Sequence, residues 1–230
     1  MTTKDSIEEM RRLLQARLQE WHLREEQPQY RSKPVVAITE EPGCRGAAIA
    51  ERLCAELDFH LYNWELVEQI AKDADVSTRL VSSLEEHPRS ELEDWLTELE
   101  GDVNLTSQAY VGSLKKVLFA IAVHGNAVIM GRGSNFFLPP DKKIGLCFVA
   151  PLDLRIKNTM EELGLSENDA RKHISNVEKK HQQLIKKYFH ADIRDPIHYH
   201  LVVNTALVKP EVIVEMVKIT HFAAWHDICH

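Results

Sequence analysis

The residues whose types and spacing could do chemistry first gather in a short stretch around residue 43. Four apolar residues with strand preference, 35–38, lead into Pro42-Gly43-Cys44-Arg45-Gly46, and apolar residues then recur at helical spacing. A buried strand, a glycine turn and a helix in this order aim backbone N–H groups and a helix N-terminus at a phosphate. The stretch therefore predicts a phosphate-binding loop at 42–46. An ordinary strand–helix turn is the simpler alternative.

This loop lacks the groups that usually complete it. A full phosphate loop reads G-x-x-x-x-G-K-[ST], with the Lys on the outer phosphates and the hydroxyl on magnesium. Here Ala47 follows the last glycine, and Ala48 and Ile49 stand where a hydroxyl is expected. The strand, glycine turn and helix are present, but the lysine and the hydroxyl are either missing or replaced by groups at other positions. Arg45, two positions before Ala47, could supply the charge or could narrow the loop.

A second glycine turn, Gly131-Arg132-Gly133, follows the apolar stretch 126–130. In parallel sheets ligands bind at the carboxyl ends of the strands, and both glycine turns are expected there. The guanidinium fork of Arg132 suits a phosphate. A strand-end turn with Arg132 in a structural ion pair is the alternative.

The elements that must position these turns alternate along the chain. Strands that are apolar on both faces, separated by helices, predict an α/β fold with a parallel sheet covered on both sides. The expected strands are 35–38, a short extended piece entering a helix at 59–66, 126–130, 143–150 and 199–204. The expected helices are 4–27, 47–57, 106–124, 152–163, 167–189 and 210–225.

Composition limits the classes of function. The chain has 230 residues, 44% hydrophobic and 27% charged, which suits one domain with insertions. A formal net charge of −7 does not favour nucleic-acid binding, and no apolar run approaches the ~20 residues of a membrane span. The N-terminus shows no signal-peptide pattern and the four cysteines form no C-x-x-C pair, so a reduced, cytoplasmic protein is expected.

The helix expected at 4–27 is amphipathic. Its apolar residues step by three and four, while Lys and Glu fill the other face. Two interpretations stay open: a helix packed on its own domain, or one that forms a homodimer with a second copy.

The histidines and Cys44 are candidates for a metal site and a reactive thiol, but their spacing in the sequence does not establish either one. The chain has twelve histidines, but nothing in their spacing makes three or four ligands converge, so no metal site is expected. Cys44 stands at a helix N-terminus beside Arg45, a setting that lowers a thiol pKa in principle. A redox-sensitive thiol and a plain serine-like substitution are both open.

Several short motifs in order resemble the cytidylate kinase-like family, a branch of the P-loop nucleoside monophosphate kinases. The resemblance runs from about residue 34 to 220 and rests on the order and spacing of the motifs. They are Glu41-Pro42-Gly43 with Gly46, Leu61-Tyr62 with Glu65-Leu66, Gly131-Arg132-Gly133-Ser134-Asn135, Ala150-Pro151-Leu152 with Arg155, Leu165-Ser166 with Ala170-Arg171, Tyr188-Phe189, Asp195-Pro196 and Val203-Asn204-Thr205.

The resemblance implies a three-layer α/β/α core that binds ATP, with Mg²⁺ carried by the phosphates, and a CMP- or dCMP-like acceptor opposite. A basic helical lid would close over both nucleotides. By this resemblance Arg132 would hold the acceptor, and Arg155 with the face of 178–187 would belong to the lid. The implied lid residues are Arg155, Glu178, Lys179 and His181. The implied catalytic cations are Arg45, Lys186 and Lys187.

The resemblance also divides the chain. Residues 1–33 would be an N-terminal amphipathic helix and linker, and 34–230 a nucleotide kinase-like domain. Within that domain, 73–105 is expected as a helical or flexible insertion and 167–189 as the lid-like basic region. Neither a nucleic acid nor a membrane is expected as a partner.

The departures from the family pattern put activity in doubt. The family commonly reads Ser-Arg-Glu-Pro-Gly-Ser-Gly-Gly-Arg at the loop, where this chain has Glu40 for the first basic residue and Ala47 for the last. His181 and Lys186-Lys187 stand where arginines are typical, and lysine lacks the bidentate fork. Losing an arginine that contacts the transition state costs ~10³-fold or more in rate.

Three hypotheses follow. The first is ATP-dependent phosphoryl transfer to a pyrimidine nucleoside monophosphate. The second is a catalytically degenerate kinase fold that acts as a nucleotide sensor or protein-interaction module. The third is a module that holds no nucleotide because Arg45 fills the loop.

Overall fold

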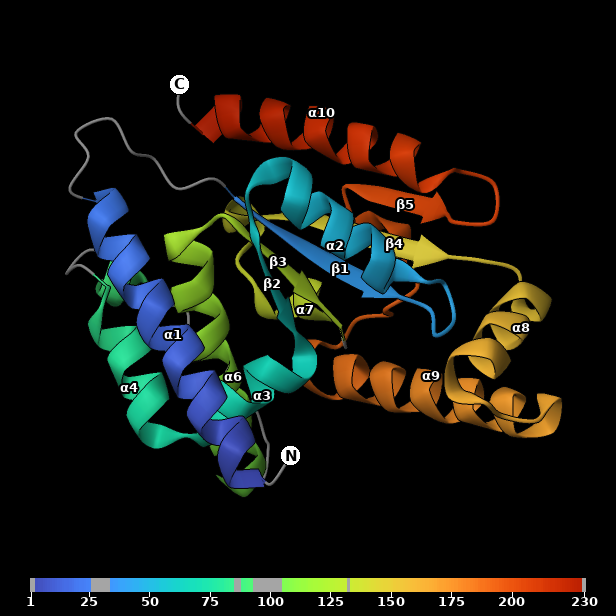
Figure 1. Ribbon diagram of the computed structural model, residues 1–230, viewed down its shortest axis with the longest axis horizontal. Coiled ribbons are helices and arrows are strands. Elements are labelled where there is room, and N and C mark those ends of the chain that lie inside the picture. Colours follow the sequence, from blue (N-terminus) through green and yellow to red (C-terminus); the bar gives the residue numbers. More distant parts are fainter. Residues whose placement is uncertain (1–2, 26–33, 85–87, 93–104, 132, 229–230) are drawn as a thin grey trace. The chain divides into compact units, whose positions relative to one another are not determined.

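The computed structural model describes residues 3–25, 34–84, 88–92, 105–131 and 133–228, and it contains a parallel five-stranded sheet (Figure 1). The strand order is β2-β3-β1-β4-β5. The strands are β1 (Val35–Glu40), β2 (His60–Asn63), β3 (Ala127–Met130), β4 (Lys143–Val149) and β5 (Leu201–Asn204). In the central register, Ile38 lies beside Met130 of β3 and Leu146 of β4. All turns that follow β1, β3 and β4 therefore lie at one edge of the sheet.

Helices cover both faces of this sheet because the strands are apolar on both. On one face lie α2 (Gly46–Leu57) and α10 (Pro210–Ile228) (Figure 1). Val36 and Ile38 share a buried cluster with residues of both helices. On the other face α7 (Ser134–Phe137) packs against β1 and β4. There the Asn135 amide lies so close to Gly145 that a Cβ would overlap it. The expected α/β/α fold is confirmed.

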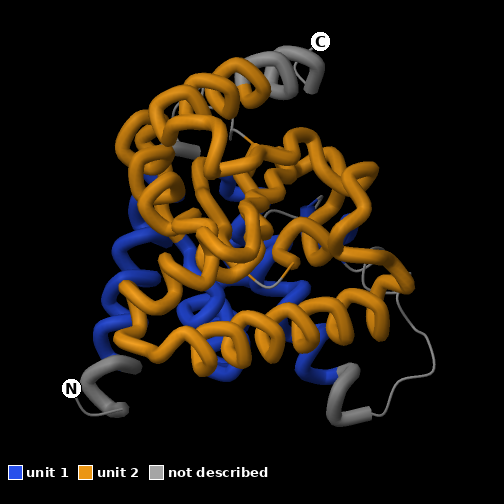
Figure 2. Tube along the Cα trace, turned by 90° about the vertical axis from the view of Figure 1, so that its right-hand side faces the viewer, with its two compact units in different colours: residues 1–33, 62–125 blue, residues 34–61, 126–230 orange. Residues whose placement is uncertain are grey.

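The chain divides into two compact units (Figure 2). The first comprises residues 1–33 and 62–125, and the second comprises 34–61 and 126–230. The first unit is helical, with α1 (Thr3–Glu25), α3 (Trp64–Lys72), α4 (Ala74–Ser82) and α6 (Leu105–His124). The second holds α2, α7, α8 (Leu152–Leu163), α9 (Glu167–Phe189) and α10, with short 3₁₀ turns at Pro140–Lys142 and Pro196–His198.

Within the first unit, α1 buries its apolar face against neighbouring helices. Met10, Leu14 and Trp21 are buried, and α1 contacts α3 and α4. The Trp21 ring stacks on His124 with ring centroids 3.9 Å apart. Burial lowers the pKa of His124 to about 4, and the nearby His22 adds to this. This packing accounts for the apolar stripe, while the homodimer stays an untested prediction.

Local sequence signals set several boundaries of the second unit. Helices 152–163 and 167–189 begin and end where the sequence predicts them. The second of them begins after Ser166 because the Ser166 hydroxyl accepts a hydrogen bond from the Asp169 N–H. The strand predicted at 199–204 begins only at Leu201, because a 3₁₀ turn capped by Asp195 precedes it. The segment predicted as a helical or flexible insertion contains α4, which starts where Asp73 accepts from the Val76 N–H. No described helix has the combination of length and apolar character that a membrane crossing needs.

Candidate functional site

The turn after β1 has the backbone geometry of a tight loop that opens a helix. Gly43 has a φ of 88°, and Arg45, the residue before α2, has a φ of 57°. A Cβ at Gly43 would overlap the carbonyl oxygen of Arg155 and press on Thr159. Glycine is therefore required at position 43 for both its backbone conformation and its close contact with α8.

The side of this loop that faces α8 is held by hydrogen bonds. Asn158 Nδ2 donates to the Gly43 carbonyl at 2.7 Å. Arg155 Nη1 lies 3.5 Å from the Pro42 carbonyl, and its Nε donates to the Ala150 carbonyl at 3.0 Å. Arg155 is only 6% exposed. We call this side, formed by Arg155, Asn158 and Thr159 against the loop, the outer side of the loop.

Arg155 also links the loop to α9. Its Nε lies 3.3 Å from a carboxylate oxygen of Glu41, and its Nη1 lies 2.7 Å from Glu178. Glu178 in turn pairs with Arg194 at 3.4 Å. The predicted lid residues Arg155 and Glu178 are therefore in direct contact, and they form a partly buried chain of charges from the loop to α9.

On its other side, which we call the inner side, the loop holds a carboxylate. Glu40 Oε2 accepts a hydrogen bond from the Gly46 N–H at 2.8 Å, at the first residue of α2. Burial raises the pKa of the Glu40 carboxyl to about 7, the Gly46 hydrogen bond opposes this, and the charge of Glu162 adds to it. The sequence shows only that Glu40 replaces a basic residue of the family pattern, and it does not predict the hydrogen bond with Gly46.

The cations predicted to act in catalysis, and the lid residue Lys179, have exposed side chains. The Arg45 side chain is 52% exposed and pairs with Glu161 and Glu162 of α8. Lys179, Lys186 and Lys187 are exposed along α9, and Lys187 Nζ lies 4.9 Å from the centre of the Tyr188 ring. Arg45 therefore does not fill the loop. The catalytic roles predicted for these cations stay predictions.

A cavity of about 220 Å³ opens beside the loop at the carboxyl edge of the sheet, entirely within the second unit. Strand ends form its floor, the loop forms one wall, and α9 with the segment after it forms the other. The lining residues are Thr39, Glu40, Glu41, Pro42, Cys147, Val149, Glu178, His181, Gln182, Ile193, Arg194 and Val202. Burial raises the pKa of Cys147 to about 12, so this thiol is not nucleophilic.

The second glycine turn lies at the same edge of the sheet. Gly131 and Gly133 have φ angles of 120° and 77°, and a Cβ at Gly133 would press on Ile185 of α9. Arg132, predicted to hold the acceptor, lies outside the described residues. At the opposite edge of the sheet, the half-buried Lys143, the first residue of β4, donates to the carbonyls of Asn135 and Leu138. Burial lowers the pKa of Lys143 to about 8, and Asp141 opposes this.

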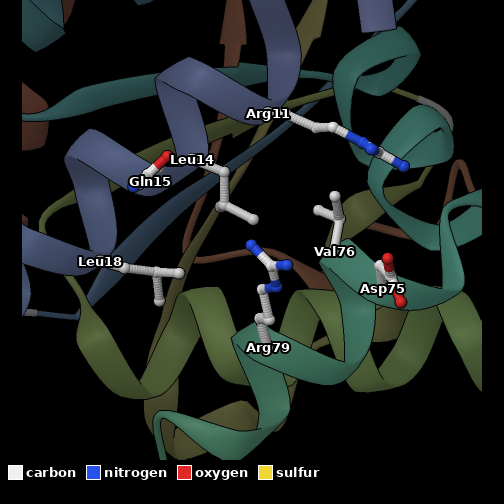
Figure 3. Close-up of a pocket in the computed structure, with 7 residues that line it drawn as sticks. All are labelled: Arg11, Leu14, Gln15, Leu18, Asp75, Val76 and Arg79. Carbon is white, nitrogen blue, oxygen red and sulfur yellow. The ribbon is translucent and has the colours of Figure 1, made fainter. Parts of the chain in front are cut away.

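The first unit has a separate, smaller cavity of about 110 Å³ between α1 and α4 (Figure 3). Its lining combines apolar side chains with two arginines and an aspartate: Arg11, Leu14, Gln15, Leu18, Asp75, Val76 and Arg79. Arg11 is already paired with Asp73 at 2.8 Å. Charges of both signs therefore surround this cavity.

Comparison with known proteins places this loop, cavity and sheet in a family. The family model of the Cytidylate kinase-like family matches residues 35–207, three quarters of the chain. The chain belongs to the cytidylate kinase-like family. The matched range includes the glycine loop and all of the residues described above that contact it, from Glu40 to Arg194.

The chain is also similar to one curated protein and to two solved structures. A cytidylate kinase from Ignicoccus hospitalis is 26% identical over 185 residues, covering 80% of this chain and 96% of its own. An uncharacterised protein from Eubacterium ventriosum shares the fold with a TM-score of 0.55 and 19% identity, covering 82% of this chain and 98% of its own. A shikimate kinase from Bacteroides thetaiotaomicron matches with a TM-score of 0.46 and 11% identity, over 82% of this chain and 98% of its own.

Over the part of the chain that the structure describes, no three side chains of His, Cys, Asp or Glu are placed to share a metal ion.

Proposed function

We propose that this nucleotide kinase-like protein transfers the γ-phosphate of ATP to a pyrimidine nucleoside monophosphate. The observation that supports this most directly is the cavity at the carboxyl edge of the sheet, bounded by the glycine loop and by α9. In parallel α/β sheets this edge is where ligands bind. Membership of the cytidylate kinase-like family supplies the reaction class.

In this proposal the residues act mainly by positioning. Backbone N–H groups at the start of α2 would donate hydrogen bonds to phosphate oxygens, and Mg²⁺ would arrive with the ATP phosphates. Arg194 borders the cavity with a half-exposed side chain, and it would neutralise charge on the transferred group. Arg155 would hold the loop and α9 together. The family resemblance implies that Arg132 holds the acceptor and that Lys179 belongs to the lid. It also implies that Arg45, Lys186 and Lys187 act as catalytic cations.

The test is a coupled ADP-release assay with ATP, Mg²⁺ and each nucleoside monophosphate in turn. We expect turnover with CMP or dCMP and at least tenfold less with purine monophosphates. Arg194→Ala should lower kcat more than it raises the KM for either nucleotide, because charge on the transferred group grows in the transition state. Lys157→Ala, which removes an exposed cation of α8, serves as the matched control. Turnover that is absent with all acceptors would refute the proposal.

A second candidate function is nucleotide binding without turnover, as a sensor or interaction module. Two residues favour it: Ala47 stands where a cation is expected, and the Glu40 carboxylate already accepts from Gly46. ATP that raises the melting temperature while no acceptor yields ADP would support this function over the first. If nucleotides neither bind nor turn over, both candidates fall.

A further inference from the structure

The first backbone N–H of α2 is already used by a side chain of the same chain. Helix starts leave several N–H groups without helical partners, and these carry partial positive charge that favours anions. Arg45, the residue before α2, provides no side-chain cap. Glu40 reaches across the loop instead, and its Oε2 lies 2.8 Å from the Gly46 nitrogen. A carboxylate therefore occupies the position that favours a phosphate oxygen.

The fit between Glu40 and Gly46 is close. Glu40 is the last residue of β1, so its backbone is fixed by the sheet. A Cβ at Gly46 would overlap the Glu40 carboxylate and approach the ring of Phe148. Only glycine at position 46 allows the carboxylate to come this close.

The charges around Glu40 are mostly of the same sign. Glu41 follows it in the chain, Glu162 of α8 adds a repulsive charge, and the Cys44 thiol faces it from the loop. Across the cavity lie Glu178, His181 and Arg194 of α9 and the segment after it. The two arginines nearest the loop are engaged elsewhere, Arg45 with Glu161 and Arg155 with Glu41 and Glu178. The Gly46 N–H is therefore the main group that favours the ionised carboxylate.

We propose that Glu40 is an internal substitute for a phosphate: its carboxylate closes the loop against ATP, and nucleotide phosphates bind only when it leaves. This inference rests on the nucleotide site of the proposed function and assigns Glu40 as the residue that sets affinity there. Two anions cannot share one N–H without repulsion. The apparent affinity is therefore reduced by the fraction of molecules in which the loop is open.

Protonation offers a second way to open the loop. Because burial raises the pKa of Glu40 to about 7, part of the population is neutral at that pH. Affinity for phosphates should therefore rise as the pH falls from 8 to 6. The phosphates themselves also gain protons over this range, so the comparison must be made against a variant without the carboxyl.

The experiment measures the Kd of pyrophosphate and of MgATP by calorimetry at pH 8. It compares the wild type with Glu40→Ser and Glu40→Gln. Glu51→Gln, on an exposed position of α2, is the control for net charge. We expect Glu40→Ser to bind both probes about tenfold tighter or more, Glu40→Gln to show an intermediate gain, and Glu51→Gln to match the wild type. If the serine variant does not fold, the glutamine variant, which preserves shape, decides the test alone.

Failure of this inference is distinct from failure of the proposed function. Equal or weaker binding of pyrophosphate by both Glu40 variants overturns the inference, even if the wild type phosphorylates CMP. An equal gain from Glu51→Gln also overturns it, because net charge would then be the cause. Tighter pyrophosphate binding without turnover on any monophosphate supports the inference and refutes the kinase reaction.

Discussion

The two sides of the glycine loop differ in what holds them. On the outer side, Arg155 and Asn158 of α8 bind loop carbonyls, and Arg155 joins two carboxylates. On the inner side, one carboxylate, Glu40, accepts one backbone N–H. The outer side thus determines the shape of the loop, while the inner side determines what the loop can bind. A loop built this way keeps its backbone even when the residues that would contact phosphate have changed.

The largest loss of unfolding free energy is expected for Arg155→Met, on the outer side of the loop. This change leaves Glu41 and Glu178 partly buried without their common cation, and breaking a buried pair costs about 3–5 kcal/mol. The measurement is the free energy of unfolding from urea titration. Arg171→Met, at an exposed arginine of α9 paired with Glu167, is the control and should cost less than about 1 kcal/mol. A loss at Arg155 no larger than at Arg171 would contradict the account of the outer side.

The next largest effect is a change of unfolding free energy with pH, caused by Glu40 on the inner side of the loop. The folded pKa of Glu40, about 7, lies above its ordinary value of 4.5, so the folded state binds the proton more tightly. The contribution of Glu40 to stability is therefore fully present below pH 4.5 and is lost, by up to about 3 kcal/mol, as the pH rises through 7. Glu40→Gln should remove this fall. Urea titrations of both proteins from pH 5 to 8 give the difference, and parallel curves would contradict the prediction.

A smaller effect is expected from one hydrogen bond of the outer side. Asn158→Ala removes the donor to the Gly43 carbonyl and should cost about 1–2 kcal/mol of unfolding free energy. It should also weaken MgATP binding, because the loop loses a support. Asn168→Ala, exposed in the first turn of α9, should change neither quantity. Equal behaviour of the two variants would show that this bond does not hold the loop.

The smallest effect on stability is expected for Arg45→Ala. Its ion pairs with Glu161 and Glu162 are half exposed, and such pairs contribute about 0.5 kcal/mol or less. Thermal unfolding gives this quantity. Turnover decides the separate prediction from the sequence: a loss of activity with unchanged stability would assign the Arg45 guanidinium to the nucleotide phosphates after all.

Much of the fold could be predicted from the sequence, and the site only in part. The strand–turn–helix at 35–57 and the helices 152–163 and 167–189 follow from local patterns, and the structure confirms them. The direction of Arg45 depends on Glu161, which lies 116 residues away, and no local pattern contains that contact. The Glu40–Gly46 hydrogen bond likewise exists only once the loop has closed. The order of motifs in the sequence therefore indicates the family, while the partners of Arg45 and Glu40 could be found only from the structure.

The most direct test of the central claim follows the backbone amide of Gly46 by ¹⁵N–¹H NMR during a titration with MgATP. If ATP phosphates replace the Glu40 carboxylate at the start of α2, the Gly46 resonance will shift with the same saturation curve as nucleotide binding, and Glu40→Ser will saturate at lower MgATP. A Gly46 resonance that stays fixed while MgATP binds elsewhere, or shifts equally in both proteins at equal concentrations, would contradict the claim.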